Sequence, residues 1–187
     1  MSTVDAALAA GTWVGDPVHS DISFKVRHMG VGKVRGRFAL ASAALTVGDD
    51  GGRVTALIDP ASVDTGNRQR DQHLRSADFL DVENHPQIEF TSTEVRGFDG
   101  ETFVLVGELT LHGVTETVEL EAEFHGVVDD PSGAGRTGFS ATTTISRAAF
   151  GVDIQLAFGA GNAVVADAIE IAIEIEFTGT GPDPDPR

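Results

Sequence analysis

The segment RQRDQHLRSADFLD, Arg68 to Asp81, carries the densest group of charged and titratable side chains in this 187-residue sequence. Within it, Arg70, Asp71 and His73 are close enough in sequence to act together on one molecule. A histidine and a carboxylate can transfer protons as an acid/base pair, whereas a guanidinium or an imidazole can bind the polar end of a ligand. One hypothesis is therefore an acid/base enzyme, and another assigns Arg70 and His73 to head-group contacts.

The same segment has the pattern of a short helix with one apolar side. Asn67 is a suitable N-cap for a helix near residues 67–78, and Leu74, Phe79 and Leu80 are the only large apolar side chains of the segment. These three can pack on an apolar interior while the charged residues pair with one another or face water. This division is typical of a helical plug over a barrel end, and we favour the plug over catalysis.

Other patterns for catalysis or cofactor binding are absent from the sequence. It has no cysteine, which excludes disulfides, thiol nucleophiles and thiolate metal ligands, and it has no GxSxG serine elbow. The histidines form no HExxH or HxH pattern, so we expect scattered turn and rim histidines, no metal site and no resident cofactor. The glycines of HMGVGKVRG lack the GxxxxGK[ST] pattern and the strand-turn-helix context of a phosphate-binding loop, which predicts a mobile rim loop. The histidines are His19, His28, His73, His85, His112 and His125.

Composition limits the partners and the compartment. The chain has 13 basic and 29 acidic residues and a formal charge of −16, which argues against nucleic acid as a partner. No run approaches the roughly eighteen apolar residues of a membrane-spanning helix. The first residues, MSTVDAALAAG, have neither the basic region nor the apolar core of a secretion signal. We expect a cytoplasmic protein with no stable membrane insertion.

The elements that must position these groups are strands, because apolar residues recur at every second position along most of the chain. Ile22, Phe24 and Val26 alternate with polar residues, and residues 118–124 alternate with a comb of glutamates that we expect to face water. Turn signals such as GDDGG and HGVTE separate the runs. About eight short strands and one helix predict an all-β sandwich or barrel.

A barrel is favoured over a sandwich because closure removes exposed strand edges. The interior of an eight-stranded barrel can be filled by side chains or can hold one small ligand. We predict a flexible N-terminus at residues 1–11, one barrel domain at residues 12–178 and a disordered Gly/Pro/Asp-rich tail at residues 179–187.

Four stretches are distinctive in their order and separation. They are WVGDPVHS at 13–20, ASVDTGNRQRDQHLRSADFLDVENHPQIEF at 61–90, GELTLHGVTETVEL at 107–120 and ISRAAFGV at 145–152. Through them, the chain from about residue 12 to residue 178 resembles the YceI-like family of polyisoprenoid-binding, lipocalin-like barrel proteins. One departure is Ser146, which stands before Arg147 where the family often has Asp or Asn.

The resemblance implies an extended eight-stranded antiparallel lipocalin-like barrel that holds a lipid-like chain, often as a homodimer. It implies no established catalytic reaction, although some members are linked to isoprenoid quinone metabolism or stress responses. Many members carry a secretion signal that the first residues here do not resemble. We expect the helical segment to close or flank one end of the barrel. The resemblance predicts that the protein binds, stores or carries a polyisoprenoid or a similar amphiphile, including an isoprenoid quinone or its precursor.

Ligand contact is predicted for apolar residues on the inward strand faces and on the loop from Ala149 to Val164. That loop suits a portal for a lipid or a lid packed on the core equally well. For every residue, ordinary core packing is the competing interpretation, and the competing functions are an enzyme acting on such a lipid and a filled structural or interaction barrel. The predicted contacts are Phe24, Val26, Phe38, Leu40, Phe90, Leu105, Leu111, Phe139, Ile145, Phe150, Leu156, Phe158, Ile171 and Ile173.

Overall fold

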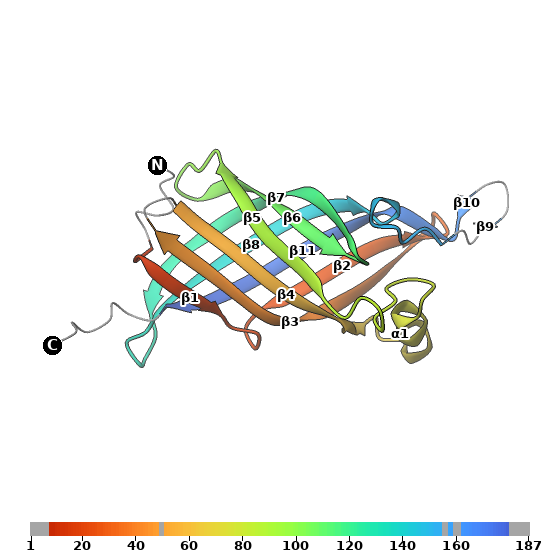
Figure 1. The fold of residues 1–187 in the computed structure, drawn as a ribbon, viewed down its shortest axis with the longest axis horizontal. Coiled ribbons are helices and arrows are strands. Elements are labelled where there is room, and N and C mark those ends of the chain that lie inside the picture. The colour runs from red at the N-terminus through yellow and green to blue at the C-terminus, as the bar shows by residue number, and fades with distance from the viewer. Residues whose placement is uncertain (1–7, 49–50, 155–156, 159–161, 180–187) are drawn as a thin grey trace.

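The computed structural model describes residues 8–48, 51–154, 157–158 and 162–179, and it is an elongated barrel of long antiparallel strands (Figure 1). The strands are β1 (Gly11–Gly15), β2 (Asp21–His28), β3 (Gly32–Gly48), β4 (Gly51–Asp64), β5 (Ile88–Arg96), β6 (Thr102–Leu111), β7 (Val114–Asp129), β8 (Gly135–Ser146), β9 (Ala157–Phe158), β10 (Asn162–Ala163) and β11 (Val165–Gly179). The helix α1 (Arg68–Arg75) and the 3₁₀ turn η2 (Ala148–Phe150) complete the described elements.

Eight strands form the closed ring. Their order is β11-β2-β3-β4-β5-β6-β7-β8, and a long ladder from β8 back to β11 closes it, from Ala168 opposite Ser146 to Thr178 opposite Arg136. Closure pairs the main-chain groups that an open sheet would leave at its two edges. The predicted all-β, eight-stranded antiparallel barrel is therefore confirmed.

The short strand β1 does not add a ninth strand to the ring, because it has the same two neighbours as β2. Gly15 on β1 pairs with Phe177 on β11, and Asp21 on β2 pairs with Glu174 a few residues further along the same strand. The two strands also share β3 as their other neighbour. β1 and β2 thus form one interrupted strand, and residues 16–20 are the loop that bulges out between them.

Hydrogen bonds around one carboxylate shape that loop. Asp16 Oδ1 accepts from the main-chain N–H groups of Val18 and His19 at 3.0 and 3.3 Å. Asp16 Oδ2 accepts from His19 Nδ1 at 2.8 Å and from Arg136 Nη1 at 3.1 Å. The bond from His19, followed by that from Arg136, lowers the pKa of Asp16 to about 2. The loop is thereby tied to β8, and Arg136 reaches on to Glu176 of β11 at 2.9 Å.

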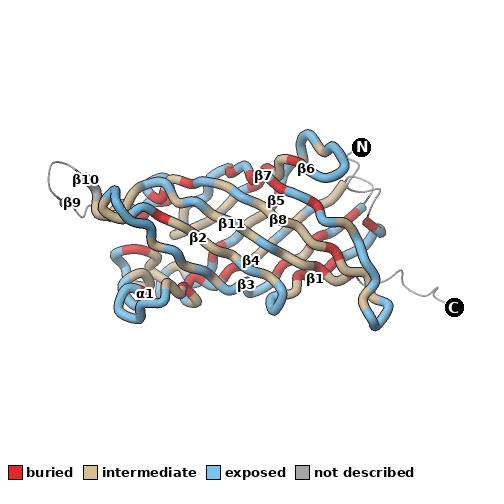
Figure 2. The backbone as a smooth tube through the Cα atoms, turned by 180° about the vertical axis from the view of Figure 1, so that it is seen from behind, coloured by how far each residue is buried: buried red, intermediate tan, exposed pale blue. Residues whose placement is uncertain are grey.

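Alternation along the strands separates inside from outside. On β7, Val118, Leu120, Ala122 and Phe124 are buried, while the glutamates between them are exposed, so the comb faces solvent as predicted. Figure 2 shows the same division over the whole tube, with exposed stretches between less exposed ones along the strands. The isoleucines of β11 are only half-buried although they point inward, because they face an internal space and not packed atoms.

The predicted rim loop over HMGVGKVRG is confined to residues 29–31, because the rest of the segment is strand, and its mobility stays a prediction. Met29 and Gly30 make a tight turn with positive φ angles of 52° and 72°, and strand β3 already begins at Gly32. From there Lys33, Arg35 and their neighbours pair with β2 along the whole hairpin. Glycine is favoured at position 30 because the turn gives this residue a positive φ.

The expected helix forms, and it is shorter than the 67–78 segment. It runs from Arg68 to Arg75, and Asn67 is its N-cap because its side-chain oxygen accepts from Arg70 N at 3.0 Å. It lies at the opposite end of the barrel from the termini (Figure 1). None of the helices in the described ranges has the length and apolar character needed to cross a membrane.

The described strands reach from Gly11 to Gly179, and the predicted division into a tail at each end and one barrel domain stays a prediction. β1 begins at Gly11, a buried Leu8 precedes it, and β11 ends at Gly179. Residues 1–7 and 180–187, which hold most of the predicted flexible N-terminus and tail, lie outside the described residues.

Replacing Asp16 with asparagine should remove part of the acid sensitivity of folding. A carboxyl whose pKa is about 2 in the folded chain and 3.8 ordinarily contributes stability that is fully present above pH about 4 and is lost as the pH falls towards 2. Urea unfolding of wild type and Asp16→Asn across that range should show the steeper loss in the wild type.

The exposed Asp21, at the start of β2, provides the matched control. Asp21→Asn removes one carboxylate from the same region and should retain the steep acid dependence of the wild type. An Asp16→Asn curve that parallels the wild type below pH about 4 would show that the Asp16 network does not contribute to folding in the expected way.

Candidate functional site

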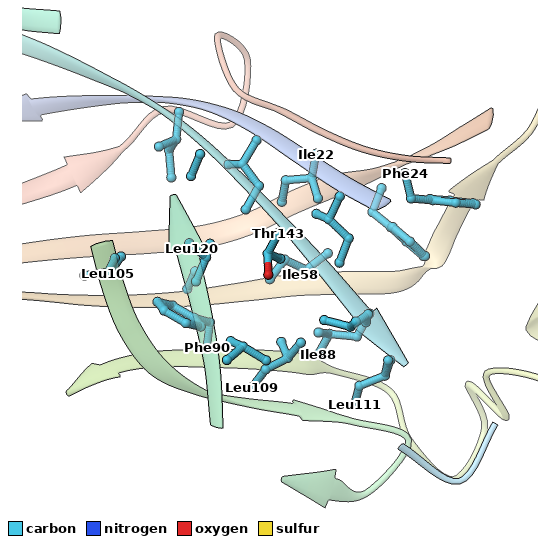
Figure 3. A pocket seen from close by; sticks show the side chains of 18 of the residues that line it. Ile22, Phe24, Ile58, Ile88, Phe90, Leu105, Leu109, Leu111, Leu120 and Thr143 are labelled. Atoms are coloured by element: carbon cyan, nitrogen blue, oxygen red, sulfur yellow. The ribbon is translucent and has the colours of Figure 1, made fainter. Parts of the chain in front are cut away.

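The barrel encloses a long apolar cavity of about 550 Å³. This lies within the range of roughly 300–1,000 Å³ that is typical of small-molecule sites. Side chains from strands all around the ring point into it, and Figure 3 shows Ile58, Phe90 and Leu120 directed toward one shared space. The interior is therefore lined by the inward faces of the strands but not filled by them.

The predicted contact residues are mostly found on this lining. Phe150 is the exception among those described, because it is 2% exposed and packs beneath the wall against Val118, Leu120 and Ile145. Leu156 and the side chain of Phe158 lie outside the described residues, so the portal-or-lid question for that loop stays a prediction. The predicted residues that line the cavity are Phe24, Val26, Phe38, Leu40, Phe90, Leu105, Leu111, Phe139, Ile145, Ile171 and Ile173.

Two phenylalanine rings owe their positions to glycines on neighbouring strands. A Cβ atom at Gly36 would come within 2.4 Å of the ring of Phe24, and one at Gly107 would come within 2.4 Å of the ring of Phe90. Only glycine leaves the backbone bare enough for a ring to lie across it. These strand glycines therefore shape the cavity wall, a role that their spacing in the sequence did not reveal.

Aromatic side chains close the end of the cavity that lies toward the chain termini. Phe103, Phe139 and Phe177 line the cavity there and contact one another, with ring centroids 6.2 Å apart for Phe103–Phe139 and 6.1 Å apart for Phe139–Phe177. Phe124 stacks on Phe139 at 5.3 Å, and Trp13 belongs to the same buried cluster. Aromatic rings dominate this end, and Gly51, Gly52, Thr93 and Glu94 also line the cavity on this side.

The opposite end is covered by α1 and the chain that follows it. Leu74, Phe79 and Leu80 line the cavity, as expected for a plug. Arg75 fixes the plug to β4, because its Nε donates to Ala61 O at 2.6 Å and its Nη2 donates to Val63 O at 2.8 Å. Arg75 therefore holds this segment to the main chain of β4.

The proposed acid/base residues are not assembled on the cavity. Asp71 is 7% exposed and accepts from the N–H and the hydroxyl of Thr65 at 2.9 and 2.5 Å. Arg70 also binds Thr65, and His73 Nε2 lies 2.7 Å from Asp78 on the exposed side of the plug. Neither Arg70 nor His73 lines the cavity, so these side chains build the plug and do not face its interior.

Arg147 is a lining residue that sequence analysis did not select. It is 9% exposed, and its guanidinium donates to the main-chain oxygens of Ala166, Val152 and Val165 at 3.1, 2.7 and 3.1 Å. It also lines the cavity at the end where α1 lies. The barrel thus places a buried positive charge beside a mostly apolar interior. In the sequence, the only signal for this residue is its place in the ISRAAFGV motif.

Side chains of β11 and β8 accept hydrogen bonds from the turn that follows Arg147. Asp167 Oδ1 accepts from Ala148 N at 2.9 Å, and Ser146 Oγ accepts from Ala149 N at 3.2 Å. A hydrogen bond from Ser146, the N–H of Ala148 and the charge of Arg147 together lower the pKa of Asp167. Ser146 therefore fulfils a structural role at the position where the sequence departs from the family pattern.

A second polar stretch of the lining lies where β4 and β5 separate. These strands pair only from Thr55–Thr91 to Ile58–Ile88, and beyond that Val54 N donates to the side chain of Ser92 at 2.8 Å. Thr93 and Glu94 follow, and both line the cavity. The wall is therefore less tightly paired here than elsewhere in the ring.

The histidines are not all scattered, contrary to the sequence-based expectation. The rings of His85 and His112 are 4.7 Å apart between centroids although the residues lie on different segments. Folding also brings them to Asp81, with one potential ligand atom from each residue within 4.8 Å of the others. A search of the sequence for close histidine spacing could not detect a group that forms only in space.

Comparisons with known proteins agree with this architecture. The family model described as YceI-like domain matches residues 13–177. A UPF0312 protein of Pectobacterium carotovorum subsp. carotovorum is 43% identical over 141 residues, which are 74% of this chain and 73% of that protein.

Solved structures show the same fold. The YceI protein of Campylobacter jejuni superposes with a TM-score of 0.67 at 28% identity, covering 82% of this chain and 90% of that one. A polyisoprenoid binding domain from Saccharophagus degradans, implicated in plant cell wall breakdown, gives a TM-score of 0.72, covering 91% of this chain and 99% of that one. At 16% identity, the second likeness establishes the fold alone.

Replacing Arg75 with methionine should loosen the plug while leaving the barrel folded. The change keeps a long side chain but removes two hydrogen bonds from a charged donor, a loss worth about 1–3 kcal/mol. Amide hydrogen exchange at residues 65–80 should become faster, with little change in the strands of the ring. Arg68→Met is the control, because Arg68 is exposed and the described contacts give its side chain no hydrogen bond. Equal protection of the plug in both variants would contradict its attachment through Arg75.

Proposed function

The chain belongs to the YceI-like family, and we propose that its barrel binds and carries a polyisoprenoid or a similar long-chain amphiphile, including an isoprenoid quinone or its precursor. The observation that carries the proposal is the apolar cavity, enclosed by the ring and capped by α1. Because a polyisoprenoid binding domain has this fold, a polyisoprenoid is the ligand class to test first.

Burial of the tail supplies the affinity. Each methylene-sized group moved from water into an apolar site contributes about 0.8 kcal/mol. The isoleucines of β11 and the aromatic rings around Phe139 offer contact along the length of such a tail. Because the lining has few polar groups, the site favours long apolar chains as a class and selects weakly among them.

Arg147 gives the ligand an orientation. A guanidinium has five N–H donors, and three of them are used by the carbonyl oxygens of Ala166, Val152 and Val165. Among the described contacts, the remaining two are free to donate to a carbonyl, hydroxyl or phosphate oxygen of a ligand. We place the head group beside Arg147 and the tail toward Phe139 and Phe177.

The geometry favours carriage over catalysis on the lipid. The acid/base residues proposed from the sequence, Arg70, Asp71 and His73, bind within the plug and to Thr65. The lining residue Glu94 is 59% exposed and lies 3.7 Å from Arg96. A cavity of about 550 Å³ likewise disfavours the filled structural barrel. Assembly as a homodimer and residence in the cytoplasm stay predictions.

Narrowing the cavity should weaken ligand binding without unfolding the barrel. Ala141 lines the cavity on β8, and a phenylalanine there occupies space that the tail would otherwise fill. Decyl-substituted benzoquinone, titrated into the protein, should quench the fluorescence of Trp13, the single tryptophan, which belongs to the buried cluster around Phe139. We expect Ala141→Phe to weaken this binding at least about tenfold, or 1.4 kcal/mol.

The matched control is the same change on the outer face. Ala172 on β11 is exposed and pairs with Thr142, one residue from Ala141, so Ala172→Phe should bind the quinone as the wild type does. Urea unfolding midpoints would show that both variants remain folded. Binding that Ala141→Phe leaves intact, or that Ala172→Phe weakens equally, would place the ligand outside the cavity.

A further inference from the structure

We propose that Asp81, His85 and His112 form a binding site for a divalent transition-metal ion of the Zn²⁺ class. Each side chain offers a ligand atom, and the three atoms all lie within 4.8 Å of one another. All three residues are half-buried, so they combine partial shelter with access for an ion. The site is distinct from the lipid cavity and does not depend on the proposed function.

A tight turn presents His112. Leu111 pairs with Val114, so His112 and Gly113 are the two central residues of the β6–β7 hairpin, and both have positive φ, at 53° and 74°. This is the backbone pattern of a type I′ turn. His112 is a non-glycine residue held in the left-handed region, which fixes where its imidazole can point.

Glycine next to it makes room for the second imidazole. A Cβ atom at Gly113 would approach the ring of His85 to 2.7 Å, so His85 lies directly on the bare backbone of the turn. His85 comes from the chain that follows α1, where His85 N donates to Asp81 O at 2.8 Å. The two segments therefore meet at this point through their imidazoles.

The third group is oriented in the same way. Asp81 has a φ of 45°, another left-handed non-glycine residue, and Asn84 Nδ2 donates to both of its carboxylate oxygens at 3.1 and 2.9 Å. Hydrogen bonds of this kind fix the direction of a ligating carboxylate. Each carboxylate oxygen keeps a further lone pair for a metal ion.

The tautomer of His112 also suits a ligand. Its Nδ1 lies 3.3 Å from Phe150 O, and a ring nitrogen can bond a carbonyl oxygen only as an N–H donor. In the neutral ring, Nε2 then carries the lone pair. Metal-ligating histidines commonly donate their other ring N–H to a carbonyl oxygen in this manner.

The donor set selects the ion. Two imidazoles and one carboxylate suit Zn²⁺ and its transition-metal neighbours, whereas Ca²⁺ and Mg²⁺ prefer all-oxygen sites. At bond lengths of about 2.0–2.1 Å, the ligand atoms of a tetrahedral site lie roughly 3.3 Å apart. Side-chain rotations that move the three ligand atoms by about an ångström would therefore close the group around the ion. Three protein ligands leave the fourth position to water.

A second group of similar composition does not meet these requirements. Asp16, His19 and Glu176 also bring ligand atoms within 4.8 Å, but Arg136 donates to both carboxylates at 3.1 and 2.9 Å. The guanidinium already neutralises the acids and would repel a cation. Among the described residues, Asp81, His85 and His112 form no ion pair with Lys or Arg.

A bound ion would join two parts of the barrel mouth. His112 belongs to the β6–β7 turn, and Asp81 and His85 belong to the chain that continues from the plug. The residues just before two of the ligands, Leu80 and Leu111, line the cavity. The metal would therefore fasten the covering segment to the wall.

The test is titration of the full-length, chelator-treated protein with Zn²⁺ by calorimetry and with Co²⁺ by visible absorption at neutral pH. We expect one ion per chain at micromolar concentration, an intense tetrahedral Co²⁺ spectrum and displacement of Co²⁺ by Zn²⁺. Asp81→Asn, His85→Gln and His112→Asn should each weaken Zn²⁺ binding at least about tenfold. Asparagine is chosen at positions 81 and 112 because it tolerates positive φ.

His19→Gln is the matched control, since it removes a histidine from the second group. It should leave the Zn²⁺ affinity and the Co²⁺ spectrum unchanged, and circular dichroism would verify that every variant is folded. The proposal is overturned if the wild type binds no Zn²⁺ at micromolar concentration. It is equally overturned if the three site variants bind as the wild type does, or if His19→Gln loses the ion.

Discussion

Pairing between β8 and β11 closes the ring, and the rest of the structure depends on that closure. Once eight strands are paired side to side, every second side chain must point inward, and the diameter is fixed by the number and tilt of the strands. The inward residues of this sequence are mostly aliphatic and do not fill that width along the whole length. A cavity of about 550 Å³ therefore follows from the sequence pattern and the geometry of closure together.

The two ends of the barrel are covered in different ways. At the end beside β1, aromatic rings pack around Phe139. At the other end, a polar segment has to cover an apolar space, so its charges bind main-chain oxygens and turns while Leu74 and Phe79 face inward. Arg147 is buried at this end with its hydrogen bonds shared among three carbonyl oxygens. The contrast places the aromatic rings at one end of the cavity and the buried guanidinium of Arg147 at the other.

Strand alternation made the barrel and its inward faces predictable, because a period of two survives folding unchanged. The plug was predictable for a different reason, since Asn67 can cap a helix and Leu74, Phe79 and Leu80 are the only large apolar residues of a charged segment. Features that arise from segments meeting in space were not predictable. His85 and His112 are far apart in sequence, and the place of Gly107 beneath Phe90 depends on strand register.

The central claim is that the barrel interior holds a long-chain amphiphile, and native mass spectrometry of freshly purified protein tests it most directly. The expected spectrum shows the 19.6 kDa chain, alone or as an oligomer, with an added mass that organic extraction releases as a hydrophobic compound. A protein produced in a native-like host that shows only the mass of the bare chain, and that takes up no polyprenyl compound when one is supplied, would contradict the account.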